Sequence, residues 1–159
     1  MQLMFGADRL SDGLKLRFEV IGAVTDIKLP TTGRRERRDE LWKQTCFEAF
    51  LTSDDFSGYL EFNFAPNGDW AAYQFEAYRD GGSNLTMDAP DIQTDRASDR
   101  LAVTATIARL PEELLSGQIQ IGPAAILQTH HGNKSYWALA HPVERPDFHR
   151  PENFKINLD

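Results

Sequence analysis

Cysteine, basic residues, long apolar runs and amphipathic helices are all scarce in this sequence. Its one cysteine, Cys46, leaves no partner for a disulfide within the chain. No apolar run approaches the roughly 20 residues that a membrane-spanning helix needs. The first residues lack the basic and apolar stretches of a signal peptide. We therefore expect a cytoplasmic protein without a membrane partner, in which Cys46 is a buried and unreactive thiol.

Positive charge is also in short supply. The 159 residues include 17 basic and 24 acidic side chains, which gives a formal net charge of -7. Such a balance repels a phosphate backbone unless the basic groups cluster strongly. The densest basic stretch, 34–38, is short and is interrupted by Glu36. We therefore expect no nucleic acid partner.

Sequence motifs of common enzymes are absent as well. The chain contains no Gly-x-Ser-x-Gly, no phosphate-binding loop and no dinucleotide fingerprint. It also has no linker or internal repeat, and its length suits one domain spanning 1–159. The best helical signal is the short stretch 110–115, with a proline at its start and acids in its first turn. So little helix argues against an α/β fold.

Short strands account for most of the remaining pattern. In 14–20, Leu14, Leu16, Phe18 and Val20 alternate with charged residues, which is the period of a half-buried strand. Turn signals such as Asn67-Gly68 separate further stretches of this kind. The pattern predicts an all-β fold, an antiparallel β-sandwich with one short helical turn, in which 142–159 crosses the sheets as irregular chain. The predicted strands are 14–20, 45–51, 59–64, 70–79, 101–107, 119–121, 125–128 and 136–140.

Three polar residues fall on one face of this predicted sheet. By strand parity Glu48, Glu61 and Asn63 lie opposite the Phe and Leu residues that fill the core. Such groups can accept hydrogen bonds from the hydroxyls of a sugar, or can ligate a hard cation such as calcium. The alternative is an ordinary solvent-facing sheet surface.

Aromatic and guanidinium groups near this face extend the candidate site. Trp42 and Trp137 occur in polar, loop-rich sequence and offer flat surfaces for stacking on a sugar ring, although aromatic residues also fill cores. Arg38 and Arg79 can donate a planar fork to a carboxylate or to vicinal hydroxyls. Their alternative is a surface salt bridge of little energetic value.

Two stretches carry a family resemblance. Residues 40–51, with Trp42 before an acid-bearing strand, and 59–70, with Glu61, Asn63 and Pro66-Asn67-Gly68, resemble the DOMON-like proteins related to family nine carbohydrate-binding modules. The ending 147–154 is similar to the closing segment of such modules. The resemblance implies a jelly-roll β-sandwich that binds a sugar or another small ligand, in some members haem, and that is generally not catalytic.

Our leading hypothesis is therefore non-catalytic binding of a small ligand, with a carbohydrate as the first choice. Three alternatives stay open: haem bound through His149 or Met87, a structural or interaction domain without a ligand, and a glycoside hydrolase that uses Glu48 and Glu61 as acid and base. The oligomeric state is not encoded in these patterns. The candidate ligand-binding residues are Arg38, Trp42, Glu48, Glu61, Asn63, Arg79 and Trp137.

Overall fold

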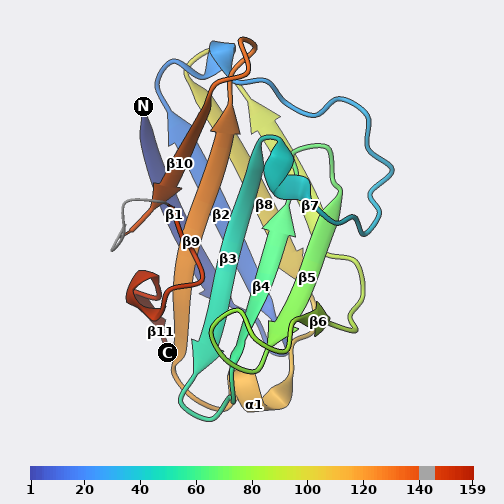
Figure 1. Ribbon diagram of the computed structural model, residues 1–159, viewed down its shortest axis with the longest axis vertical. Coiled ribbons are helices and arrows are strands. Elements are labelled where there is room, and N and C mark those ends of the chain that lie inside the picture. The colour runs from blue at the N-terminus through green and yellow to red at the C-terminus, as the bar shows by residue number, and fades with distance from the viewer. Residues whose placement is uncertain (140–145) are drawn as a thin grey trace.

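The protein consists of two antiparallel β-sheets packed face to face (Figure 1). The computed structural model describes residues 1–139 and 146–159. The predicted all-β sandwich is confirmed. The first sheet has the order β1 (Gln2–Arg9), β2 (Leu14–Ile21), β8 (Arg100–Ile107), β7 (Asp91–Arg96). The second has the order β10 (Lys134–Ala138), β9 (Ile119–Gln128), β3 (Cys46–Ser53), β4 (Tyr59–Phe64), β5 (Trp70–Phe75), β6 (Ser83–Asn84), and β11 (Ile156–Leu158) pairs with β9.

Helical structure in the described residues is limited to single turns. The predicted turn is confirmed as α1 (Glu112–Leu115), and three 3-10 turns accompany it: η1 (Val24–Asp26), η2 (Leu41–Lys43) and η3 (Pro151–Asn153). Within the described residues, no helix has the length and apolarity to span a bilayer.

The main core lies between the two sheets. The alternating apolar residues of β2 are fully buried, as their pattern predicts, and they pack against Phe47 and Phe64 of the second sheet. Burial of each such side chain contributes about 1.5–3 kcal/mol. Cys46 is fully buried, as expected, and burial raises the pKa of its thiol well above the usual range.

Strand register places the three polar residues as their parity predicts. On the face of the second sheet that points away from the main core, Glu48 of β3 is paired with Asn63 of β4, and Glu61 of β4 is paired with Tyr73 of β5. These residues are buried nonetheless, so the face is not plain solvent-exposed surface.

The C-terminal segment, defined here as residues 146–159, covers part of this outer face (Figure 1). A second apolar cluster forms beneath it, in which Phe148 and Phe154 of the segment meet Phe50 and Tyr59 of the sheet. The segment contains η3 and β11, so the prediction of irregular chain was wrong for these parts. The predicted positions of Ala140 and Pro142 lie outside the described residues.

The other corrections concern strand ends and edges. The predicted strand 70–79 is too long, because β5 ends at Phe75 and a turn over 76–80 follows, closed by the Glu76 N–H donating to the Asp80 carbonyl at 2.9 Å. Arg79 has a φ of 52° in this turn. The strands β1 and β7 were missed, since both lie at sheet edges and expose every second residue or more.

Candidate functional site

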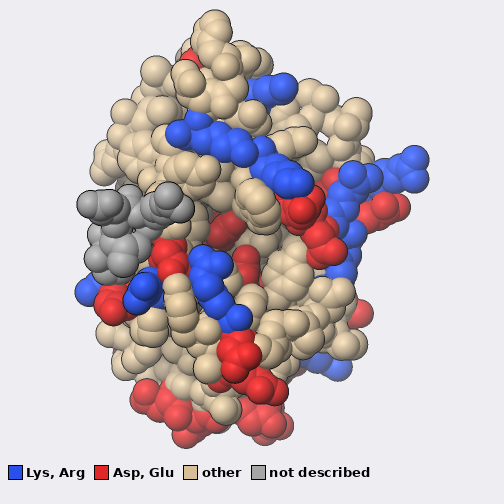
Figure 2. All heavy atoms as spheres, viewed as in Figure 1, with Lys and Arg blue, Asp and Glu red and all other residues tan. Residues whose placement is uncertain are grey.

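A cavity of about 580 Å³ opens on the outer face of the second sheet. Figure 2 shows this face hollowed near its middle, with acidic atoms recessed in the hollow and basic side chains around its edge. Glu48, Glu61 and Asn63 form the floor. The walls and rim are Asp39, Glu40, Trp42, Tyr73, Phe75, Arg79, Gly82, Ile126, Tyr136, Pro146, Phe148 and His149.

The floor holds two carboxyl groups that are almost removed from water. Glu48 is 4% exposed, Glu61 7% and Asn63 1%. Burial raises the pKa of Glu48 well above its usual range, and the nearby Glu61 charge raises it further. Burial also raises the pKa of Glu61 to about 7, against the opposing effects of the Asn63 hydrogen bond and the Arg79 charge. The pair therefore retains a proton near neutral pH.

Hydrogen bonding distinguishes the two acids. Asn63 Nδ2 donates to Glu61 Oε1 at 3.1 Å, and His149 Nε2 lies 3.5 Å from Glu61 Oε2. Within 1–139 and 146–159, no hydrogen bond or ion pair reaches the Glu48 carboxyl group. Asn63 Oδ1 is also buried without a hydrogen-bond partner in this part of the chain.

His149 lies in the cavity wall beside Glu61, and a hydrogen bond to Tyr59 holds its ring in place. Its Nδ1 lies 2.8 Å from the Tyr59 hydroxyl, which accepts the Arg79 backbone N–H at 3.0 Å. Burial, together with the Arg79 charge, lowers the pKa of His149 to about 4, so the ring is neutral at pH 7. With the Tyr59 proton donated to Nδ1, the proton of neutral His149 is on Nε2, toward Glu61.

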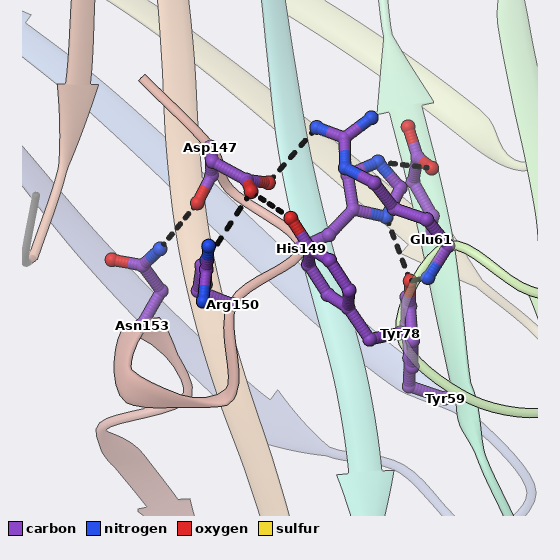
Figure 3. Close-up of polar contacts among 8 residues, drawn as sticks. Tyr59, Glu61, Tyr78, Asp147, His149, Arg150 and Asn153 are labelled. Atoms are coloured by element: carbon purple, nitrogen blue, oxygen red, sulfur yellow. Dashed lines mark hydrogen bonds and ion pairs between the residues drawn. The ribbon is translucent and has the colours of Figure 1, made fainter. Parts of the chain in front are cut away.

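Asp147 ties the C-terminal segment to the turn after β5 (Figure 3). Its carboxylate accepts a hydrogen bond from Arg79 Nη2 at 2.9 Å and one from the Tyr78 hydroxyl, and Arg150 Nε lies 3.4 Å away. Burial alone would raise the pKa of Asp147, but the hydrogen bonds from Tyr78 and Arg79 lower it below the usual value. The Arg79 charge at the cavity rim is therefore already matched by a carboxylate.

Loop and strand residues complete the aromatic walls. Tyr73 of β5 is fixed by its hydroxyl, which donates to Asp39 Oδ1 at 2.6 Å. Trp42 lies in η2 and is 49% exposed, so its ring faces both the cavity and solvent. Glu40 enters η2 with a φ of 61°, a left-handed turn that brings the 39–42 loop over the sheet.

Five of the seven candidate residues line the cavity: Trp42, Glu48, Glu61, Asn63 and Arg79. Two do not. Arg38 lies 3.4 Å from Asp69 by its Nε and lines a separate cavity. Trp137 packs against the main core and donates from Nε1 to Ser135 Oγ at 3.0 Å. Neighbouring residues of a strand point to opposite faces, so on β10 it is Tyr136, and not Trp137, that reaches the cavity.

Sequence reasoning named His149 only as a possible haem ligand, and it did not include Phe148 or Tyr136 among the candidate ligand-binding residues. Tyr136 could have been found from strand parity, had the register of β10 against β9 been known. No local pattern places His149 and Phe148 beside Glu61, because only the path of the C-terminal segment over the sheet brings them to the cavity.

The residues suggested for haem do not fit that group. Both ring nitrogens of His149 face protein groups, the Tyr59 hydroxyl and Glu61, so neither is free to ligate iron. Met87 packs against the main core, away from His149. Within the described ranges, no group of three or more His, Cys, Asp or Glu side chains could hold a metal ion.

The sequence matches no family model and no curated protein. The fold is similar to the crystal structure of a candidate carbohydrate-binding protein from Bacteroides uniformis, with a TM-score of 0.60 and 13% sequence identity. The match covers 97% of this chain and 76% of that chain. At this identity the likeness shows a shared sandwich fold. Membership of the DOMON-like family and the jelly-roll connectivity stay predictions.

Proposed function

We propose that the cavity binds a small carbohydrate and releases it unchanged. The observation that carries the proposal is the union of buried polar groups with flat aromatic walls in one cavity of about 580 Å³. This volume lies within the range of about 300–1,000 Å³ typical of small-molecule sites. Sugars present hydroxyl groups at the ring edge and apolar C–H groups on the ring faces, so both kinds of lining have a partner.

The similarity to the Bacteroides uniformis protein supports the same ligand class, since carbohydrate binding is the function its name suggests. Trp42 is the stacking residue in this proposal, because its ring is half exposed at the rim and no other ring within the described residues covers it. Glu48, Glu61 and Asn63 accept hydrogen bonds from the hydroxyl groups that reach the floor.

We propose binding without hydrolysis because of where the two acids lie. Glu48 and Glu61 are on adjacent strands of one floor and approach a ligand from the same side. A glycosidase needs its acid and its nucleophile or base on either side of the scissile bond. Activated aryl glycosides should therefore remain intact between pH 4 and 8. Turnover that Glu48→Gln abolishes would contradict this part of the proposal.

Binding is tested by titrating mono- and disaccharides while following tryptophan fluorescence and heat. We expect saturable binding that Trp42→Ala weakens about 3- to 10-fold, since an aromatic contact is worth about 0.5–1.5 kcal/mol. Met4→Ala is the matched control, because Met4 is equally exposed but lies on the first sheet. The absence of saturable binding for every sugar would favour the structural or interaction role, and equal effects of both variants would remove Trp42 from the site.

A further inference from the structure

The cavity floor is short of hydrogen-bond donors. Glu48 receives no hydrogen bond from the described residues, and Asn63 Oδ1 has no partner among them, although both residues are at least 96% buried. A buried polar group without a partner costs about 1–3 kcal/mol. Asn63 Oδ1 can only accept a hydrogen bond, and the same holds for Glu48 once it is ionised, so the ligand that best satisfies both carries several donors and a positive charge that favours the ionised carboxylate.

Charge points to the same ligand. The lining includes the acids Asp39, Glu40, Glu48 and Glu61. Glu40 is paired with Lys43 Nζ at 2.6 Å, and the one Lys or Arg of the lining among the described residues, Arg79, is paired with Asp147 at 2.9 Å, so neither cation pairs with the floor acids. His149 is neutral at pH 7. A cation would therefore favour ionisation of the floor carboxyl pair, whereas an anion would meet no unpaired Lys or Arg among the described lining residues.

Geometry allows one donor group to serve both acceptors. Glu48 and Asn63 are direct partners across β3 and β4, and such pairs have Cβ atoms about 4.5–5.5 Å apart. A primary ammonium carries three N–H donors and one positive charge on a single atom. The aromatic rings of Tyr73 and Tyr136 in the lining also favour a cation, by cation–π attraction, whereas the Trp42 ring already has Lys43 Nζ 5.8 Å from its centroid.

We propose that the ligand is a cationic amino sugar whose ammonium group binds between the Glu48 carboxylate and Asn63 Oδ1. This inference rests on the proposed function, because the carbohydrate ring occupies the aromatic walls in the way described above. It adds that an unmodified amine on that ring, and not the ring hydroxyls alone, determines which sugar is bound.

Proton release is an independent signature of this binding mode. The empty acid pair retains a proton near neutral pH, and an ammonium that takes its place favours the ionised carboxylate, so the proton leaves. The groups facing the pair from surrounding elements are Cys46 on β3, Tyr59 on β4, Tyr73 on β5, Arg79 in the following turn, Asp39 before η2, and His149 in the C-terminal segment. Of these, His149 is already neutral and Arg79 stays charged, so the proton comes from the carboxyl pair.

Calorimetry at pH 6.5, where the amines are almost fully protonated and take up little proton on binding, tests the inference with glucosamine, galactosamine and mannosamine, each compared with its parent hexose and its N-acetyl derivative. We expect at least one amine to bind on the order of tenfold tighter than both neutral partners, the effect of one charge-assisted hydrogen bond. Glu48→Gln should abolish that preference, and Asp8→Asn, an exposed acid on β1, should leave it intact. Titrations in phosphate and ACES buffers, which contain no primary amine and differ in ionisation enthalpy, should show proton release for the amine in the wild type, a readout that needs no variant to fold.

Each outcome separates this inference from the proposed function. Neutral sugars that bind as tightly as the amines, without proton release, would overturn the amino-sugar inference and leave carbohydrate binding supported. Cyclohexylamine that matches the amino sugars would keep the ammonium site and overturn the carbohydrate ring as its carrier. No binding by any of these compounds would overturn both.

Discussion

Burial of the Glu48 carboxyl group costs folding free energy, and glutamate side chains are seldom buried to this extent. A carboxyl group at 4% exposure, without a hydrogen bond from the described residues, destabilises the fold, and it does so more when it is ionised than when it is protonated. Its direct neighbours across the sheet, Asn63 and Ala124, offer it no positive charge. A small apolar residue would serve the fold better at this position, which is why we place Glu48 at the centre of the binding site.

We predict that Glu48→Gln becomes more stable relative to the wild type as the pH rises from 5 to 8. The folded-state pKa of Glu48 lies above its unfolded value, so the wild type loses stability as the pH rises through that interval, by up to about 1.4 kcal/mol per pH unit. Glutamine does not titrate and avoids this loss. Urea denaturation at several pH values measures the difference.

Asp8→Asn is the control for this series, because Asp8 is an exposed acid on β1, which belongs to the other sheet. A pH-independent difference between Glu48→Gln and the wild type would mean that Glu48 is ionised in the folded protein throughout.

At the scale of elements, the C-terminal segment decides whether the sheet face is a surface or a cavity. It reaches the sheet at β9, where Gly122 leaves room for Phe154. From there it carries Phe148 and His149 to the cavity wall, and Asp147 anchors it to Arg79 and Tyr78. The segment and the turn over 76–80 therefore form one side of the site together.

We predict that Gly122→Ala loosens this segment and weakens ligand binding. A Cβ at position 122 would lie 2.8 Å from Phe154 Cδ1 and 3.0 Å from the Asn153 carbonyl oxygen, so the segment must shift. Overpacking of this kind costs typically about 1–3 kcal/mol. Hydrogen exchange at Asn153 and Phe154, whose amides donate to Arg150 and Pro151, should accelerate.

Gly6→Ala is the matched control, since nothing lies within 4 Å of a Cβ at that position of β1. Unchanged exchange in residues 146–159 of the Gly122→Ala protein would show that the segment does not depend on this close approach.

At the scale of the whole molecule, two apolar regions have different structural roles. The main core between the sheets holds the sandwich together, and the smaller cluster under the C-terminal segment shapes the cavity. The net charge of -7 adds a long-range attraction for cations that salt screens over about 8–10 Å.

We predict that Phe62→Ala mainly lowers the stability of the whole sandwich, whereas Phe148→Ala mainly loosens the C-terminal segment and weakens ligand binding. Phe62 is fully buried in the main core, and its loss should lower the free energy of unfolding by about 3–5 kcal/mol, with hydrogen exchange accelerated in both sheets. Phe148 belongs to the outer cluster, so its loss should accelerate exchange mainly in residues 146–159 and reduce ligand affinity. Equal loss of protection across both sheets in the two variants would mean that the regions form one cooperative unit.

Much of the site's floor could be predicted from sequence, but its walls could not. Strand parity is a local property of the backbone, so Glu48, Glu61 and Asn63 could be assigned to one face without knowing the fold. Parity cannot say which of the two faces of β10 meets the cavity, and Trp137 was chosen where Tyr136 lies. Arg38 was chosen for its nearness in sequence to Trp42, yet its guanidinium turns toward Asp69.

The sequence by itself determined the sandwich class and the row of polar residues on β3 and β4, because both follow from a period of two along each strand. Tertiary structure alone decided that this row is buried. Phe148 and His149 are separated from Glu61 by more than 80 residues of chain, and only the packing of the C-terminal segment on β9 brings them beside it. Burial by that distant segment is what raises the carboxyl pKa values and turns a polar sheet face into a candidate binding site.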